Sequence, residues 1–595
     1  MSSKRCCAGR LLVAALALCA ARAEAQRVRT LDLIDLLPAA EVSRATEGGA
    51  AAEVRGAGRQ LAIPSGFRID YYTRLPQGAA LEIERLRSAD GGRLEVVLQT
   101  DGEEAVKVAR LAAGDDPRTV ELPDTGREPV RLSLLAEGGG LVLTRPALSA
   151  PQRPASATAA AATGAPAARA ATPPAYRPRN VILYLVDTLR ADHLGCYGYP
   201  KPVSPAIDAF AREATLFRDA IAQSPWTRPS VASIFTGLWP RTHQVNGRRD
   251  ALAPEALTLA EMLRSRGYRT AAFVTNGNVA KSFGLGQGFD TYRVLPRRAH
   301  AASDVNARAA EWLDGGSGEP FFLFLHTVEP HSPYDPPPAF RARFAPGIPE
   351  EVGKRRWLKR LGQGKIPVTP GLLRQVLGLY DAEIAAGDAG FGGLVTLLKE
   401  RGLWEETAIV FVSDHGEEFH EHGDWEHGKT LHAEMLDIPL IVRLPGLGAG
   451  RTVARPAQHI DILPTLAAYL GLPVPRTVEG RNLLPLIAGG PGAALPGEDL
   501  VFSWLEVDGF RGGAVSTADW RLIDETSREP DLGLFDRWRD PGESRDLAAE
   551  RPVAAGYLRA LLKAREMQKR GSLKAGQGEL DDELREQLRA LGYID

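Results

Sequence analysis

The sequence predicts an α/β fold with a largely parallel sheet over residues 179–545. Continuous apolar runs recur along this part of the chain, as in strands covered on both faces, and helical patterns separate them. The runs are residues 181–186, 270–274, 321–325, 408–412 and 439–442, and the helical patterns include 204–213, 258–266 and 372–398. In such folds the reactive groups collect at the carboxyl ends of the strands.

The chain on either side of this region has a different character. Residues 26–148 contain short alternating runs separated by Gly, Asp and Pro, which predicts a small antiparallel β-sandwich. Carbohydrate binding and a plain packing or spacer role are both open for it. Residues 149–178 are rich in Ala and Pro, which is typical of a linker. Residues 546–595 have helical composition and form a predicted C-terminal tail.

The amino-terminal segment has the pattern of an export signal. Lys4, Arg5 and Arg10 precede the apolar residues 11–21, a run too short to span a bilayer, and a small-x-small pattern ends at Ala25. We therefore interpret residues 1–25 as a signal peptide and expect a periplasmic or secreted protein, with an anchor formed by an uncleaved signal as the alternative. No other stretch of the sequence is apolar enough for a transmembrane domain.

Charge and cysteine content exclude several classes of protein. The formal net charge of -2 gives no indication of a nucleic-acid partner. Only Cys196 lies outside the predicted signal. The exported chain can therefore form neither an internal disulfide nor a zinc–thiolate cluster. We expect Cys196 to be structural, because no activating base lies near it in sequence.

Three polar features lie where strands of the predicted sheet should end. Asp187 closes the first strand, Asp414 and His415 follow the 408–412 strand, and Thr227 directly precedes a helix that we expect to begin near Pro229. Carboxylates, an imidazole and a hydroxyl suit one divalent cation, which would activate the hydroxyl as a nucleophile. The alternative is that the two aspartates only cap helices or turns.

Five motifs occur in the order and spacing of a known family. The sequence resembles the sulfatase family of the alkaline phosphatase superfamily over roughly residues 179–545, but not in the β-rich region before them. The motifs are residues 180–187, 227–237, 321–333 (FFLFLHTVEPHSP), 413–423 (SDHGEEFHEHG) and 427–445. The resemblance implies a mixed sheet flanked by helices.

The resemblance also implies roles for individual residues. It makes Asp187, Asp414 and His415, with Thr227, the ligands of one divalent metal, and it makes Thr227 the nucleophile. His331 and His427 would contact the substrate anion or protonate the leaving group. A further metal site among His420, His422 and His427 is a weaker alternative. The remaining histidines are expected at the surface or behind the site: His326, His420, His422 and His432.

The departures from the family pattern concern the nucleophile. Sulfatases carry Cys or Ser, which is converted to formylglycine, where this chain has Thr227, and threonine cannot give that aldehyde. The family's arginine is replaced by Val231, and its Lys-x-His is absent from residues 274–278. A branch of the superfamily that includes phosphoethanolamine and phosphoglycerol transferases does use a metal-bound threonine, although its members usually have a multi-helix membrane domain.

The sequence therefore predicts a metal-dependent hydrolase or transferase of phosphate esters, more specifically diesters, with Thr227 as the covalent nucleophile. The alternatives are a sulfuric ester hydrolase that acts without formylglycine and a degenerate sulfatase-fold binding protein. The oxygen-rich ligand set allows Mn, Zn, Ca or Mg. The expected substrate is a small-molecule, lipid-headgroup or glycan ester.

Overall fold

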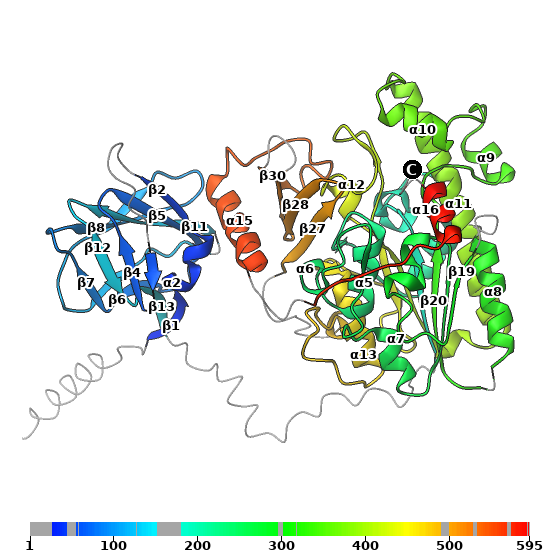
Figure 1. Ribbon diagram of the computed structural model, residues 1–595, viewed down its shortest axis with the longest axis horizontal. Helices are drawn as coiled ribbons and strands as arrows, with labels where there is room; N and C mark the ends of the chain where they lie inside the picture. Colours follow the sequence, from blue (N-terminus) through cyan, green and yellow to red (C-terminus); the bar gives the residue numbers. More distant parts are fainter. Residues whose placement is uncertain are drawn as a thin grey trace, which may run out of the picture. The chain divides into compact units, whose positions relative to one another are not determined.

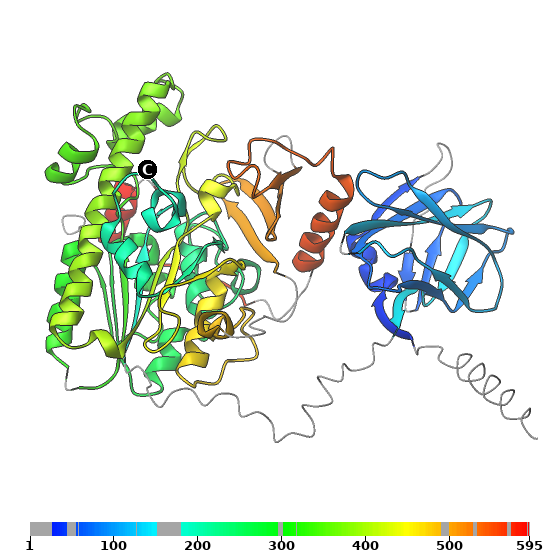
Figure 2. The same cartoon turned by 180° about the vertical axis from the view of Figure 1, so that it is seen from behind.

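The computed structural model describes residues 27–44, 55–57, 59–126, 128–151, 180–295, 302–316, 318–489, 499–526, 532–567, 573–591 and 593. The chain divides into two compact units (Figures 1 and 2), which are residues 1–172 with 548–568 and residues 173–547 with 569–595. The predicted export signal lies outside the described residues. Among the described helices, none is long and apolar enough to cross a bilayer.

The first unit confirms the predicted β-rich region, and its strands form three antiparallel sheets. Their inward-facing Leu, Ile and Val side chains form one buried core. The sheets have the strand orders β1-β13-β6-β10, β2-β5-β11-β8-β9 and β3-β4-β12-β7. The bounds are β1 Arg27–Asp32, β2 Glu41–Arg44, β3 Arg55–Ala57, β4 Gln60–Ile63, β5 Phe67–Arg74, β6 Ala80–Ile83, β7 Arg85–Arg87, β8 Arg93–Gln99, β9 Val106–Ala112, β10 Arg118–Glu121, β11 Pro129–Glu137, β12 Leu141–Thr144 and β13 Ala147–Pro151.

Strand β13 corrects the start of the predicted linker. Residues 149–151 continue this strand, because they pair with residues 27–29 of β1. The rest of the Ala/Pro-rich segment, residues 152–178, lies outside the described residues.

One helix from the predicted C-terminal tail belongs to the β-rich unit. Helix α15 spans Pro552–Met567, and the carboxylate of Asp101 accepts the backbone N–H groups of Val553 and Ala554 at 2.8 and 2.9 Å. A carboxylate at this place satisfies free N–H groups of the first turn and opposes the helix dipole. Residues 546–595 are therefore divided between the two units.

The second unit is built on an eight-stranded mixed sheet with the order β19-β18-β20-β14-β21-β24-β15-β25. The strands from β19 to β21 are parallel, whereas β24 runs antiparallel to both of its neighbours. All of the predicted strands are confirmed. The bounds are β14 Asn180–Val186, β15 Thr215–Phe217, β18 Arg269–Val274, β19 Thr291–Val294, β20 Phe321–Thr327, β21 Thr407–Ser413, β24 Leu440–Arg443 and β25 Arg451–Val453.

Alternate residues of the central strand β14 enter two different cores. Val181, Leu183 and Leu185 pack with helices α5, α7 and α13, whereas Ile182 and Tyr184 pack with α4, α8 and α11. This burial on both faces explains why the strand is apolar throughout. Figures 1 and 2 show the two helical layers. The bounds are α4 Pro205–Arg212, α5 Thr227–Thr236, α7 Leu259–Arg264, α8 Ala302–Asp314, α11 Pro370–Glu400 and α13 Ile462–Tyr469.

A smaller antiparallel sheet extends the same unit. Its strands are β27 Val501–Val507, β28 Phe510–Ser516, β29 Trp520–Glu525 and β30 Leu532–Asp536. Hydrogen bonds tie β27 to the segment before α5. The Ser503 hydroxyl donates to the Ala222 carbonyl at 2.6 Å, and the Trp504 N–H donates to the Gln223 carbonyl at 2.9 Å. The small sheet thus supports the chain that leads into α5.

Helix α5 begins at Thr227 rather than near Pro229, which corrects the predicted start. The first four N–H groups of a helix have no partner inside it, so a proline in the first turn costs no hydrogen bond. Pro229 therefore does not prevent the helix from beginning earlier. Thr227 lies in the first helical turn and not ahead of it.

Gly416 marks a close approach between the loop after β21 and helix α12 (Ala433–Leu436). Its N–H donates to the Met435 carbonyl at 2.8 Å, and a Cβ atom at this position would overlap the backbone carbonyl of Glu434. No other residue type fits here without a shift of one of the two backbones.

We therefore expect Gly416→Ala to lower the free energy of unfolding of this unit by about 1–3 kcal/mol through overpacking. The control is Gly362→Ala at the end of helix α10 (Arg355–Gly362), where a Cβ meets no atom within 4 Å. That control should be neutral or stabilising by up to about 1 kcal/mol. Scanning calorimetry compares the two variants, and equal unfolding midpoints would contradict the close approach.

Candidate active site

Asp187 and Asp414 lie side by side because of the register of two neighbouring strands. Strands β14 and β21 are parallel, Val186 is paired with Ser413, and each strand is followed directly by an aspartate. Both carboxylates are fully buried. The edge of the sheet where parallel strands end thus carries two carboxylates in one enclosed place, as the sequence predicts.

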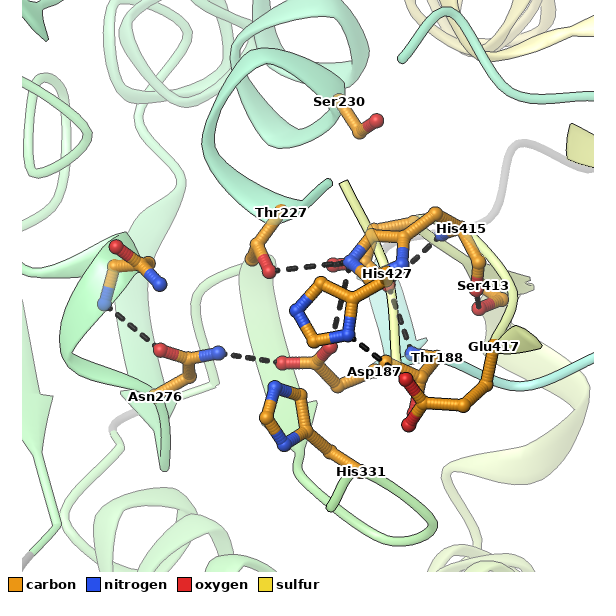
Figure 3. A network of polar contacts seen from close by, with 12 residues as sticks. Asp187, Thr188, Thr227, Ser230, Asn276, His331, Ser413, His415, Glu417 and His427 are labelled. Atoms are coloured by element: carbon orange, nitrogen blue, oxygen red, sulfur yellow. Dashed lines mark hydrogen bonds and ion pairs between the residues drawn. The ribbon is translucent and has the colours of Figure 1, made fainter. Parts of the chain in front are cut away.

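Neighbouring donors orient these carboxylates (Figure 3). The Asn276 side chain donates to Asp187 Oδ2 at 2.6 Å, and the Thr188 N–H donates to Asp414 Oδ1 at 3.2 Å. Thr188 makes its bond from a left-handed conformation with φ 55°, which is uncommon for threonine. The other two oxygens, Asp187 Oδ1 and Asp414 Oδ2, are buried without a hydrogen-bond donor among the described residues.

The electrostatics of the pair are unfavourable without a cation. Burial raises the pKa of Asp187 well above its usual value, and the charge of Asp414 raises it further. Burial likewise raises the pKa of Asp414. Of the described residues, Asp187, Asp414 and His415 form the one group of acids and imidazoles whose ligand atoms all lie within 4.8 Å of one another. The two unpartnered oxygens and this geometry fit a divalent cation.

His415 presents a lone pair to the same place. Its Nδ1 donates to the Gly416 carbonyl at 2.9 Å, which leaves the proton off Nε2 in the neutral ring. Burial lowers the pKa of His415 to about 3, so the ring is neutral near pH 7. Nε2 lies 3.4 Å from Asp414 Oδ2 and 3.7 Å from Asp187 Oδ1.

Thr227 brings its hydroxyl to this group from the first turn of α5. Its Oγ1 lies 3.3 Å from His415 Nε2, and the residue is fully buried (Figure 3). The free N–H groups of a helix start favour negative charge nearby, whether on an anionic ester or on the oxygen that attacks it. The hydroxyl therefore lies within reach of both the acidic pair and any anion held at the helix start.

His331 and His427 reach the same place from two further loops, with ring centroids 4.8 Å apart (Figure 3). His331 follows strand β20 and directs Nδ1 to the Ser332 carbonyl. His427 follows the short strand β23 (Trp425–Glu426), and its Nδ1 lies 2.9 Å from Glu417 Oε1. Because a neighbouring group occupies each Nδ1, both rings present Nε2 to the site.

The structure thus brings together all six residues that the sequence singles out, and it adds three that sequence reasoning misses. Asn276 follows strand β18, where the sequence shows only a departure from the family pattern. Glu417 lies within its motif without an assigned role. Tyr593 has no local signal, yet its hydroxyl lies 2.8 Å from His331 Nε2 and 3.1 Å from His427 Nε2.

Two neighbours of Thr227 on α5 supply no positive charge to the substrate. Val231 is fully buried in the apolar core beneath the helix. The Arg228 guanidinium lies 3.4 Å from the centroid of the Phe283 ring, and it donates to the backbone and side chain of Asn278 at 3.1 and 2.9 Å. Arg228 therefore supports the loop after β18, and burial lowers its pKa to about 9.

The other histidines of the motifs do not join His427 in a second ligand group within the described part of the chain. His422 stacks on His432 with ring centroids 3.5 Å apart, and its Nδ1 lies 2.7 Å from Glu434. His420 stacks on Trp425. The geometry therefore does not support the alternative of a further metal site. The last of these histidines, His326, lies behind the site with Nε2 at 3.5 Å from Asp187 Oδ2.

Comparison with known proteins shows the family of the chain. The sulfatase family model matches residues 179–472, and the model of the C-terminal region of N-sulphoglucosamine sulphohydrolase matches residues 420–570. Arylsulfatase A of Homo sapiens is 28% identical over 434 residues, covering 62% of this chain and 83% of the relative. The multifunctional alkaline phosphatase superfamily protein PehA of Trinickia caryophylli is 26% identical over 402 residues, covering 52% of this chain and 77% of the relative.

Solved structures show the same fold. The phosphonate monoester hydrolase of Agrobacterium radiobacter has a TM-score of 0.55 at 22% identity, covering 67% of this chain and 97% of that one. A protein solved in complex with its substrate D-glucosamine-2-N,6-O-disulfate has a TM-score of 0.57 at 19% identity, covering 66% of this chain and 99% of that one. The region that the sulfatase family model matches contains the whole central sheet and its strand-end aspartates. The chain belongs to the sulfatase family and is an ester hydrolase of the alkaline phosphatase superfamily.

Proposed function

We propose that this enzyme hydrolyses or transfers phosphate esters, with diesters as its preferred class, and that Thr227 is the covalent nucleophile. The observation that carries the proposal is the position of the Thr227 hydroxyl, 3.3 Å from His415 Nε2 beside two buried carboxylates. Threonine cannot supply the formylglycine aldehyde of sulfatases, and the buried Val231 replaces the arginine that would accompany it.

One divalent cation completes this site, with Asp187, Asp414, His415 and Thr227 as its ligands. The ligand atoms are two carboxylate oxygens, one imidazole nitrogen and one hydroxyl oxygen. The two carboxylate oxygens accept no hydrogen bond among the described residues, and the imidazole nitrogen carries a free lone pair. Mn, Zn, Ca and Mg all bind such a set of ligands. When bound, the cation lowers the pKa of the Thr227 hydroxyl and offsets the charge of the transferred group.

The charge of the site favours an ester that carries a single negative charge. The two carboxylates cancel the charge of a divalent cation, and His415 and His427 are neutral because burial lowers the pKa of both rings. A dianionic phosphate monoester would therefore bring into a buried site a second negative charge that these metal ligands and imidazoles do not balance. A phosphodiester or a sulfate monoester carries one charge and avoids that penalty.

With a phosphodiester, the proposed reaction proceeds by two displacements at phosphorus. One of the imidazoles His331 and His427 takes the hydroxyl proton of Thr227 as Oγ1 forms a bond to phosphorus. The bond from phosphorus to the leaving oxygen breaks, and the imidazole gives its proton to that oxygen, so that an alcohol leaves. Water or an acceptor alcohol then attacks phosphorus, and its proton returns through the imidazole to Oγ1. Threonine has no second hydroxyl on Cβ to expel the bound group, so this second attack on the central atom is required.

The relatives include both kinds of chemistry. Similarity to PehA, a protein of the alkaline phosphatase superfamily, and the fold shared with phosphonate monoester hydrolases are compatible with phosphorus as the central atom. The 26% identity to an ulvan-active sulfatase of Formosa agariphila favours cleavage of sulfate esters as the second candidate, with Thr227 attacking sulfur. A degenerate binding protein is disfavoured, because it has no use for the complete set of Asp187, Asp414 and His415. The predicted signal would place the reaction outside the cytoplasm, on a small-molecule, lipid-headgroup or glycan ester.

Replacement of the nucleophile tests the proposal directly. We expect Thr227→Ala to lower turnover of an aryl phosphodiester by about a thousandfold or more, because the covalent step is lost. Thr227→Ser keeps the hydroxyl and serves as the matched control, with much smaller loss. Intact mass spectrometry of protein mixed with a slow diester should show, on the wild-type chain, one phosphoryl group that still carries the second alcohol of the diester, and no adduct on Thr227→Ala.

A panel of aryl sulfate, phosphate monoester and phosphate diester substrates across the four metals completes this test. Faster turnover of sulfate than of diester would overturn the preferred class. Full activity in Thr227→Ala would overturn the nucleophile.

The metal assignment predicts opposite effects of one substitution in the presence and absence of metal. Asp414→Asn should lose bound metal, measured by elemental analysis, and should lose the thermal stabilisation that metal gives the wild type, about 2.7 kcal/mol at roughly one hundred times the Kd. Without metal, the variant should be at least as stable as the wild type, since it removes one of two facing buried carboxylates. The control is Asp314→Asn, at an aspartate whose side chain is 69% exposed. Unchanged metal content in Asp414→Asn would contradict the assignment.

A further inference from the structure

The end of the chain returns to the catalytic unit and is held there by several contacts. Strand β31 (Gly576–Gln577) pairs with β17 (Asp250–Ala251), and helix α16 (Asp582–Leu591) follows. The Asp581 side chain accepts the Leu584 N–H at 2.8 Å at the helix start. The segment from 573 onward is therefore anchored before it reaches the site.

Apolar packing fixes the last described residue. Leu584 and Leu588 of α16 form a small buried cluster with Phe283 and with the ring of Tyr593. The Arg248 guanidinium lies over this ring, 5.5 Å from its centroid. Tyr593 is only 8% exposed. These contacts direct the phenol inward, toward the three groups that the proposed reaction uses.

The Tyr593 hydroxyl lies among all of those groups. It is 2.8 Å from His331 Nε2, 3.1 Å from His427 Nε2 and 3.4 Å from Thr227 Oγ1. The Ser332 carbonyl can only accept a hydrogen bond, so neutral His331 carries its proton on Nδ1 and its Nε2 accepts. The phenol is therefore the donor to His331.

An ester that Thr227 attacks lies close to this hydroxyl. The reacting atom has to approach Oγ1 to about 3–3.5 Å, and the phenol oxygen already lies at 3.4 Å from Oγ1. When the phenol turns from the imidazoles to an anionic oxygen of a bound ester, a charged acceptor replaces a neutral one. A hydrogen bond to a charged group is roughly twice as strong as one to a neutral partner, so the exchange favours binding to the anion.

We propose that Tyr593 is a catalytic residue, supplied by the C-terminal segment, whose phenol donates a hydrogen bond to an oxygen of the group transferred to Thr227. The inference rests on the proposed function for the nucleophile but not on the choice between phosphate and sulfate. The phenol keeps its proton throughout, and no covalent bond to it forms or breaks. It stabilises charge that grows on the transferred group as the leaving oxygen departs.

The test is Tyr593→Phe, which keeps the ring in the apolar cluster and removes only the hydroxyl. We expect kcat/KM to fall about tenfold to a hundredfold, with most of the loss in kcat, because the hydrogen bond strengthens in the transition state. Tyr469→Phe is the matched control: it removes a hydroxyl that donates to the Pro445 carbonyl at 2.8 Å, and it should leave kcat/KM unchanged. Equal unfolding midpoints of the two variants show that the fold is intact.

The activities of Tyr593→Phe and Tyr469→Phe are compared on whichever ester the wild type hydrolyses. A preference for sulfate esters would contradict the proposed phosphodiester substrate, but Tyr593 could still be tested in the same way. As a second measurement, the monoanion of inorganic phosphate should bind Tyr593→Phe more weakly than it binds the wild type. Unchanged kcat/KM and phosphate affinity would overturn the proposal by showing that the hydroxyl only fills space. Higher activity or tighter phosphate binding would overturn it by showing that the phenol blocks the site.

Discussion

The catalytic unit is organised around two carboxylates that face each other in a buried site. Asp187 and Asp414 are brought together by the register of β14 and β21, in a place where water cannot screen their charges. Each keeps one oxygen without a hydrogen-bond donor among the described residues. The two negative charges of such a pair repel each other, and a bound cation offsets this repulsion. The surrounding donors, Asn276 and the Thr188 N–H, fix the other two oxygens and so define where a cation can lie.

Much of this arrangement could be predicted from the sequence, because its causes are local. The strands that carry the two aspartates are continuous apolar runs, and the carboxylates stand where these runs end. Parallel pairing then brings the ends together whatever the loops do. The start of α5 is harder to predict, because Pro229 is as compatible with the third position of a helix as with the first. The antiparallel direction of β24 also depends on tertiary packing rather than on its own residues.

The parts that could not be predicted depend on contacts between segments far apart in the sequence. Glu417 accepts hydrogen bonds from the Ser332 N–H and the Tyr334 hydroxyl, which lie 85 and 83 positions away in the sequence. Helix α15 has the composition of any amphipathic helix, and its place on the β-rich unit depends on distant contacts, such as Asp101 at its start and Arg74 over the Tyr557 ring. Tyr593 contacts residues 166 to 366 positions away, and no pattern in the last residues of the chain indicates such contacts.

The position of Tyr593 also bears on how a residue outside the family motifs can serve a site that needs defined geometry. A phenol that no other contact held would lose conformational entropy on binding, and this loss would offset much of one hydrogen bond. Here Leu584 and Leu588 fix the helix before the ring is placed, and Phe283 fixes the ring itself. Phe283 in turn packs against Arg228, the residue next to the nucleophile. The same buried guanidinium therefore supports both the loop beside Asp187 and the aromatic surface on which Tyr593 rests, so that the nucleophile and the phenol are positioned from one place.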